Sequence, residues 1–338
     1  MGYFLGLDGG NTKTHITLYN PDTGLLDLYT GGPSNYEMMP GGYAELSQVL
    51  KGMLDDFLGK HGITPADIGR AGFGMAGVDT PNQHKEISKV LQDLGFADIS
   101  LENDGILGIK AAASRGYGIS CVSGTGYSVL GLARNGETLQ IGGMSSITGD
   151  KGGGGHVMAE GVSYVYGQLF RRYAPSMLTE MFMKHFEIAH KNDFMEAMHV
   201  KYYNGDTKAF TLAVSKMVFE AAGKGDAAAI NILTESAISY GESVIGILDN
   251  LTFEPDTLEI VLNGSLFQKN PKSVLVTALA TYVKEHYGQK FALKVLDAPN
   301  VLGALIWAID KNGEGLVSEE KRVELGKQLN GILEHPRP

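Results

Sequence analysis

Hydrophobic and polar positions follow two patterns along this chain. Short apolar runs between turn residues predict strands, and apolar residues at every third or fourth position predict helices. Near the N-terminus, short apolar runs over residues 3–7, 15–19 and 25–30 are separated by clusters of Gly, Asn, Asp and Pro. Such runs and punctuation are typical of strands joined by tight turns. The pattern predicts a three-strand meander at the start of the chain.

A helical period follows this meander. Over residues 43–60 the apolar side chains recur every three or four positions, which predicts an amphipathic helix that ends by Gly62. Farther on, the pattern predicts a strand at 70–75, a helix that Thr80 caps and Gly95 ends, a strand at 99–102 and a small-residue helix at 105–114.

The second half of the chain begins with the same pattern as the first. A strand at 119–123, a glycine turn at 124–126 and strands at 128–133 and 138–141 repeat the opening unit. After them the pattern predicts helices over 157–170 and 206–251, a strand at 258–262, a helix from Asn270-Pro271 to His286, a strand at 291–296, and helices from Val301 and Ser318.

Length and repetition together predict two domains of α/β architecture. A chain of 338 residues with 43% hydrophobic residues can bury two cores. We expect a first domain at 1–117, joined by a C-terminal helix at 317–334, and a second at 118–316 with a helical insertion at about 157–251.

Charge and cysteine content exclude several classes of function. The formal net charge is −10 and no basic run is present, which argues against a nucleic-acid or anionic-membrane surface and favours a small-molecule partner. The first residues lack the pattern of a signal peptide and no apolar stretch is long enough to span a membrane, so we expect a cytoplasmic protein. One cysteine, Cys121, allows no internal disulfide and no cysteine-based metal site within one chain.

The turn in segment 6–14 carries the first candidate chemistry. A glycine turn between two strands brings backbone N–H groups close to a ligand, and Thr12 and Lys13 add side-chain donors. The turn at 124–126, with Thr125, repeats this context, although either turn alone could be only a hairpin. Asp8, at the end of the first strand, could hold Mg²⁺ through water. Two such turns predict a triphosphate site without the strand–loop–helix phosphate motif.

Asn103-Asp104 is the second candidate. It lies at the C-terminal end of a predicted strand, where open α/β sheets bind ligands. Asp104 could accept the proton of a substrate hydroxyl that attacks a phosphate, or it could only cap the following helix.

A glycine motif at 72–77 matches the dinucleotide fingerprint GxGxxG. Residues 78–81 break the helix that this fingerprint requires, so we expect a closely packed cavity wall instead.

The segments 6–14, 74–79, 103–104, 123–126, 142–143 and 149–150, in this order, resemble the N-acetylglucosamine kinase branch of the sugar kinase, heat-shock chaperone and actin superfamily. This branch is also called the BadF/BadG/BcrA/BcrD ATPase family, and the resemblance runs from about Gly2 to Ala308. It implies an actin-like ATPase fold of two ribonuclease-H-like domains, with ATP, Mg²⁺ and a sugar in the cleft between them. It also implies a homodimer as one possible assembly.

The resemblance also implies roles for residues at matching positions. Asp104 would be the catalytic base, and Asn35, Asn103, Gly143, Met144 and Asp150 would contact the sugar. Asn263, Gly264 and Ser265 would hold adenosine. The phosphate loops would be formed by Gly9, Gly10, Asn11, Thr12 and Lys13 on one side and by Gly124, Thr125 and Gly126 on the other.

Two departures from the family pattern affect the expected substrate. Met144 replaces a tryptophan and Lys151 replaces a glutamate, and Lys151 would suit an anionic substituent if it faces the cavity. We expect N-acetylglucosamine as the acceptor, with glucosamine, N-acetylmuramic acid or another hexose as alternatives. Two other classes stay open: an ATPase activator of a 2-hydroxyacyl-CoA dehydratase, which would need cluster-binding cysteines, and a sugar-binding regulator without turnover.

Overall fold

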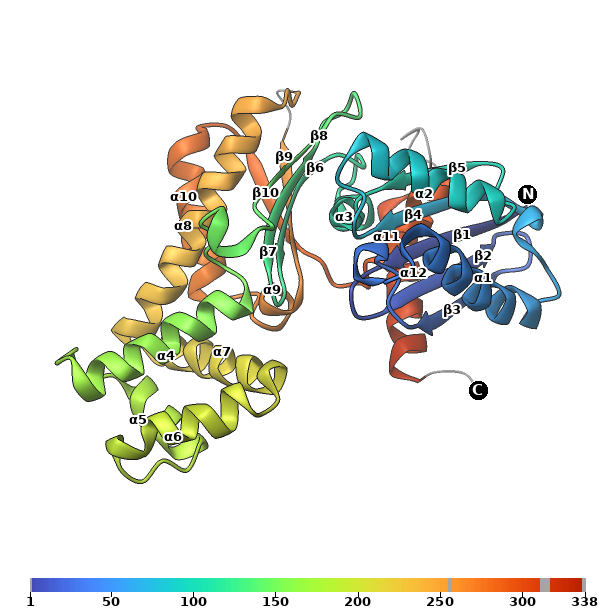
Figure 1. Cartoon of the computed structure of the whole chain (residues 1–338). Helices are drawn as coiled ribbons and strands as arrows, with labels where there is room; N and C mark the ends of the chain where they lie inside the picture. The colour runs from blue at the N-terminus through green and yellow to red at the C-terminus, as the bar shows by residue number, and fades with distance from the viewer. Residues whose placement is uncertain (1, 255–256, 311–316, 336–338) are drawn as a thin grey trace.

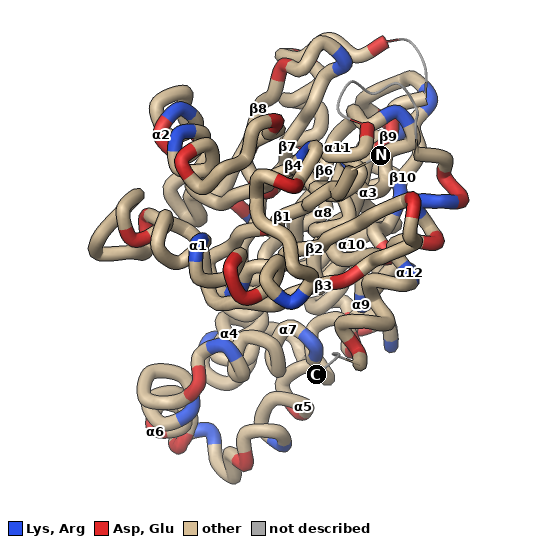
Figure 2. Tube along the Cα trace, turned by 90° about the vertical axis from the view of Figure 1, so that its right-hand side faces the viewer, with Lys and Arg blue, Asp and Glu red and all other residues tan. Residues whose placement is uncertain are grey.

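The computed structural model describes residues 2–254, 257–310 and 317–335, and these form two lobes (Figure 1). Each lobe is built on a mixed five-stranded sheet, so the predicted α/β class is confirmed. No helix in these ranges is long and apolar enough to cross a membrane. Lys and Arg lie scattered along the trace among Asp and Glu (Figure 2).

The first sheet has the order β3-β2-β1-β4-β5. The antiparallel meander β1 to β3 is present as predicted, and β4 and β5 continue the sheet in parallel. Helices α1 (Gly42–Lys60) and α2 (Pro81–Asp93) share one hydrophobic core with this sheet. The strands are β1 (Tyr3–Gly9), β2 (Thr14–Asn20), β3 (Leu25–Gly31), β4 (Ile68–Met75) and β5 (Ile99–Glu102).

The second sheet, of order β10-β9-β6-β7-β8, repeats the first strand for strand. Its strands are β6 (Gly118–Ser123), β7 (Tyr127–Leu132), β8 (Thr138–Ile141), β9 (Leu258–Asn263) and β10 (Phe291–Val295). The repeated unit predicted from the sequence is therefore real. Helices α4 (Gly154–Phe170), α5 (Met177–His185), α6 (Phe194–Met198), α7 (Thr207–Gly223) and α8 (Ala227–Asn250) lie between β8 and β9 in the chain, and α9 (Ser265–Lys269) and α10 (Val274–Tyr287) follow β9.

Helix α11 (Val301–Ile309) packs on the first sheet at very short range. An added Cβ on Gly6 of β1 would lie 2.5 Å from the Leu305 nitrogen, and one on Gly72 of β4 would lie 2.2 Å from the Ala304 oxygen. The chain therefore returns to the first lobe at α11, before residue 316, where we expected the second domain to end. Helix α12 (Glu319–Glu334), capped by Ser318, lies beside β3 on the same lobe (Figure 1).

Some boundaries differ from the predicted ones for local reasons. The helix expected from Asn270-Pro271 begins only at Val274, because Asn270 instead ends the unpredicted helix α9. The helix expected over 105–114 divides into a 3₁₀ turn, Asp104–Ile106, and α3 (Leu107–Ala112). Other short helical segments are Tyr36–Met38, Pro65–Asp67, Ser145–Ile147 and Lys191–Asp193, which are 3₁₀, and His199–Tyr203, which is π-helical.

The glycines of the GxGxxG match serve packing, as predicted. A Cβ on Gly74 would lie 2.4 Å from the Leu107 side chain, so α3 can cross β4 only where the strand has no side chain. Gly77 has a φ of +84°, a conformation that glycine adopts without strain. The motif brings β4 close to α3 and α11 and is not followed by the helix of a dinucleotide site.

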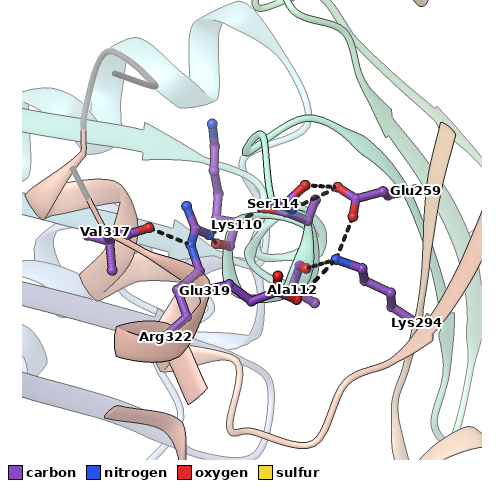
Figure 3. A network of polar contacts seen from close by, with 9 residues as sticks. Lys110, Ala112, Ser114, Glu259, Lys294, Val317, Glu319 and Arg322 are labelled. Carbon is purple, nitrogen blue, oxygen red and sulfur yellow. Dashed lines mark hydrogen bonds and ion pairs between the residues drawn. The ribbon is translucent and has the colours of Figure 1, made fainter. Parts of the chain in front are cut away.

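Polar contacts join the two lobes where α3 meets β9 and β10 (Figure 3). Glu259 of β9 accepts hydrogen bonds from the backbone nitrogen and Oγ of Ser114, at 2.7 and 2.9 Å, and forms an ion pair with Lys294 of β10 at 2.5 Å. Arg322 of α12 is 6% exposed and donates to the Lys110 carbonyl oxygen at 2.7 Å. These contacts tie the end of α3 to the second sheet and to α12.

Candidate active site

Two neighbouring cavities lie where the glycine turns of the two sheets face each other. The larger, of about 800 Å³, is lined by residues of both lobes, among them Asp8, Lys13 and Gly264. The smaller, of about 440 Å³, is lined by Asp104 and by residues of both glycine turns. Asn263 and Asn300 line both cavities, so the two spaces adjoin.

The first glycine turn is held in place by the segment that follows β3. Within the turn, the Gly10 nitrogen donates to the Lys13 carbonyl oxygen at 3.1 Å. The Asn35 side chain donates to Asn11 Oδ1 at 2.7 Å, and the Ser34 nitrogen donates to the Gly10 carbonyl oxygen at 3.1 Å. The turn is therefore fixed before any ligand binds.

The second glycine turn is braced by the N-terminus of α4. The Gly154 nitrogen donates to the Gly124 carbonyl oxygen at 2.8 Å, and the Gly155 nitrogen donates to Thr125 at 3.1 Å. A Cβ on Gly153 would lie 2.5 Å from Gly126, so only glycine permits this approach. The glycines at the start of α4 thus support the turn and do not offer these two N–H groups to a ligand.

Gly264 packs closely against the end of β6, just before the second glycine turn. Its φ is +93°, and a Cβ there would lie 2.5 Å from the Ser123 carbonyl oxygen. Gly264 and Ser265 line the larger cavity, and Asn263, only 2% exposed, reaches both cavities. The three residues predicted to hold adenosine therefore all line the larger cavity.

The hydrogen bonds of the turn after β5 distinguish the two roles considered for Asp104, proton acceptor and helix cap. Asn103 caps this turn, because its side-chain oxygen accepts from the Gly105 nitrogen at 2.8 Å. Asn103 Nδ2 also donates to Asp79 at 2.8 Å. Capping thus falls to Asn103, and Asp104 lines the smaller cavity.

Two half-buried carboxylates have unusual proton affinities. Burial raises the pKa of Asp104 from 3.8 to about 6, and the nearby charge of Asp79 adds to this effect. Burial and the charge of Asp104 raise the pKa of Asp8 to about 7, against the opposing effect of Lys13. A carboxyl with a pKa near 6 is a suitable proton acceptor at neutral pH.

The structure brings most predicted site residues to these two cavities. Asp150 does not line either one: its carboxylate accepts hydrogen bonds from the Gly143 and Ser145 nitrogens, at 2.9 and 2.8 Å, and so braces the loop. Met144 is 60% exposed. The predicted residues that line a cavity are Asp8, Asn11, Lys13, Asn35, Asn103, Asp104, Gly124, Thr125, Gly126, Gly143, Asn263, Gly264 and Ser265, whereas Gly9, Gly10, Thr12, Met144 and Asp150 do not.

Lys151 lies outside both cavities. Its ammonium group is 3.9 Å from Glu235 of α8, on the surface. Lys151 would have to face a cavity to bind an anionic substituent of the sugar, and it does not.

Other cavity residues carried no clear sequence signal. Asn300 lies at the start of α11, and its buried Oδ1 has no hydrogen-bond partner among the described residues. Glu37, Asp79 and Gln140 line the smaller cavity. For Asp79, the sequence indicated only that a helix starts at the following residues, Thr80 and Pro81, and gave no sign of a place in the cavity.

Comparison with known proteins assigns the chain to a family. The family model described as the BadF/BadG/BcrA/BcrD ATPase family matches residues 5–308. The chain belongs to this family. Similar proteins include an N-acetylmuramic acid/N-acetylglucosamine kinase of Clostridium acetobutylicum, 25% identical over 267 residues that cover 79% of this chain and 86% of the relative. An N-acetyl-D-glucosamine kinase of Dictyostelium discoideum is 23% identical, with 90% of this chain and 97% of that protein covered.

Solved structures agree with the fold. A candidate N-acetylglucosamine kinase of Chromobacterium violaceum matches with a TM-score of 0.64 at 23% identity, covering 90% of this chain and 98% of that one. A hexokinase of Schistosoma mansoni matches with a TM-score of 0.52 at 15% identity, covering 94% and 85%. The predicted actin-like ATPase fold is thereby confirmed for this family member.

Proposed function

We propose that the protein is an ATP-dependent amino-sugar kinase that converts N-acetylglucosamine and ATP to N-acetylglucosamine 6-phosphate and ADP. The observation that carries this proposal is Asp104, a half-buried carboxylate of raised pKa in a cavity lined by glycine turns of both lobes. Family membership and the named activities of the relatives support it.

The two cavities suggest how the substrates divide the cleft. ATP would take the larger cavity, with adenosine against Asn263, Gly264 and Ser265 and its phosphates near Lys13. The terminal phosphate would extend toward the second glycine turn, which lines the smaller cavity. The sugar would take the smaller cavity, which contains Asn35, Asn103 and Asp104. Because Asn300 also lines both cavities, a terminal phosphate and a sugar hydroxyl can meet beside it, away from the adenosine.

Asp104 would act as the general base. As the sugar 6-oxygen forms its bond to the γ-phosphorus, the carboxylate takes the hydroxyl proton, and the bond from phosphorus to the bridging oxygen of ADP breaks. Hydrogen bonds that hold Asn103 orient the turn from which Asp104 projects. Closure of the lobes would exclude water, which would otherwise compete as the acceptor.

Mg²⁺ is implied by the use of ATP, and Asp8 is the residue that would help to hold it. The described residues contain no group of three or more His, Cys, Asp or Glu side chains that could bind a metal alone. Mg²⁺ is commonly held by one or two carboxylates, water and phosphate oxygens. Asp8 lines the larger cavity, and the nearby negative charge of Asp104 would also attract the ion. The ion would neutralise charge on the transferring phosphoryl group.

The alternative as a dehydratase activator fits this chain poorly. Such an activator holds its cluster with cysteines from each subunit, but this chain has one cysteine. Cys121 is fully buried in β6, and burial raises the pKa of its thiol. A sugar-binding regulator would keep both cavities without turnover. The retained carboxylate of Asp104 favours the kinase.

The test is ATP consumption measured with N-acetylglucosamine, glucosamine, glucose and N-acetylmuramic acid, for the wild type and Asp104→Asn. We expect sugar-dependent release of ADP that falls by about 10²- to 10⁴-fold in Asp104→Asn, since one general base contributes an effect of that size. Asp55→Asn, the same exchange at an exposed position of α1, should change nothing. Absence of sugar-stimulated turnover in the wild type would reject the kinase.

A further inference from the structure

The smaller cavity carries carboxylates and no counter-charge. Glu37, Asp79 and Asp104 line it, and none of the described lining residues is Lys, Arg or His. The two lysines of the predicted site loops lie elsewhere: Lys13 lines the larger cavity, and Lys151 forms an ion pair with Glu235. The space proposed for the sugar is therefore electronegative.

Glu37 and Asp79 are held together on one rim of this cavity by Gln83 of α2. The Gln83 side-chain nitrogen donates to Glu37 Oε1 at 3.1 Å, and its oxygen accepts from the Asp79 backbone nitrogen at 3.0 Å. Gln83 also donates to the Tyr36 hydroxyl at 2.6 Å. The rim is thus built from the segment after β3 and the loop after β4, both on the first lobe.

The two carboxylates also influence each other. Burial, and then the charge of Glu37, raise the pKa of Asp79, while its hydrogen bond from Asn103 works in the opposite direction. A third carboxylate brought by a ligand would meet the same repulsion without a donor such as Asn103 to offset it.

We propose that Glu37 and Asp79 select the acceptor by charge, so that the cavity admits amino sugars with uncharged or cationic substituents and rejects those that carry a carboxylate. This inference rests on the proposed function. It separates the chain from its relative in Clostridium acetobutylicum, whose name includes N-acetylmuramic acid, a sugar with an anionic lactyl group. A like charge in a partly desolvated cavity is repelled more strongly than in water.

The test compares three acceptors with the intact protein. They are N-acetylglucosamine, N-acetylmuramic acid, and the lactyl amide of N-acetylmuramic acid, which has nearly the shape of the acid but no charge. Specificity constants are measured by ADP release, and sugar binding is measured separately by calorimetry. The variants are Glu37→Gln, Asp79→Asn and the double variant, with Glu220→Gln on an exposed part of α7 as the matched control.

We expect the wild type to prefer the amide over the acid by about tenfold or more, and each single variant to narrow this ratio by about threefold. The ratio should also narrow at high salt, which screens the repulsion. Because the ratio compares two ligands in one protein, a general loss of activity in Asp79→Asn does not affect it.

Three outcomes would overturn the charge selection and leave the proposed function standing. Equal use of acid and amide would show that charge does not matter, and equal rejection of both beside good use of N-acetylglucosamine would show that size decides. A ratio unchanged in the double variant would remove Glu37 and Asp79 from the explanation. If none of the sugars binds or reacts, the proposed function itself fails and the charge selection fails with it.

Discussion

Asn103 and Asp79 are joined by a 2.8 Å hydrogen bond from the side-chain amide to the carboxylate. At its other end Asn103 caps the turn that carries Asp104, through a 2.8 Å bond from the Gly105 nitrogen. One amide therefore connects the loop after β4 to the proposed catalytic base. Asp79 is a positioning residue in this arrangement, because it acts on Asp104 through Asn103 and through its charge.

The variant Asn103→Asp separates the capping role of Asn103 from its hydrogen bond to Asp79. Aspartate is an equally good cap, so the midpoint of thermal unfolding should stay within a few degrees of the wild type. The donor to Asp79 is lost and two carboxylates then face each other, so kcat should fall by about tenfold or more and the pKa of Asp104 should rise. The dependence of kcat on pH is measured for Asn103→Asp and for Asn103→Ala, which adds no charge. The same pH profile in both variants would contradict an effect of the added charge on Asp104.

Activity should depend on pH through Asp104. Its pKa is raised to about 6, and only the deprotonated form accepts a proton, so kcat/KM for the sugar should be lost as pH falls through about 6. Asp79→Asn removes a charge that raises this pKa, so its acid limb should move to lower pH. Rates measured from about pH 5 to about pH 8 test both statements. An acid limb that does not move in Asp79→Asn would count against the electrostatic link.

The carboxylate of Asp8 should lower the free energy of unfolding of the ligand-free protein. Its pKa is raised from 3.8 in the unfolded chain to about 7, so the folded state binds the proton more tightly and this site's contribution to the free energy of unfolding falls as pH rises through that window. Asp8→Asn removes the penalty, and should stabilise the protein at pH 8 by on the order of 1 kcal/mol. The same variant should bind Mg²⁺ and ATP less well.

Thermal unfolding of wild type and Asp8→Asn at about pH 5 and about pH 8 tests the sign, because the stabilisation should be larger at the higher pH. Asp55→Asn, on the exposed face of α1, serves as the control. A stabilisation that is the same at both pH values would contradict the raised pKa as its cause.

The crossing of α3 and α11 should tolerate no side chain. A Cβ on Gly303 would lie 2.0 Å from the Leu107 carbonyl oxygen, so Gly303→Ala must push the helices apart. We expect a loss of about 2 kcal/mol or more in the free energy of unfolding, measured by denaturant titration. Gly331→Ala in α12 is the matched control, because a Cβ there has no neighbour within 4 Å and alanine favours a helix. Similar losses in both variants would contradict the packing explanation.

Much of the secondary structure follows from local sequence. The meander of the first lobe and its copy at β6 to β8 are visible because alternation and turn residues act within a few positions. Thr80 and Ser318 cap the helices that the sequence predicted for them. Helix α9 and the late start of α10 were missed, because Asn270 was expected to begin a helix but ends one. Its backbone and side-chain nitrogens donate to the carbonyl oxygens of Phe267 and Leu266, at 3.1 and 2.9 Å.

The sequence by itself determined the two repeated strand–turn–strand units, the glycine turns and the order of motifs, since these depend on residue type and short-range spacing. The tertiary structure alone decided which side chains share a cavity. Only packing places Asp79 on Asn103 and leaves Lys151 outside the cavity beside Glu235. Such contacts join residues that are far apart in the sequence, and their distances depend on how the elements pack, which no local pattern encodes.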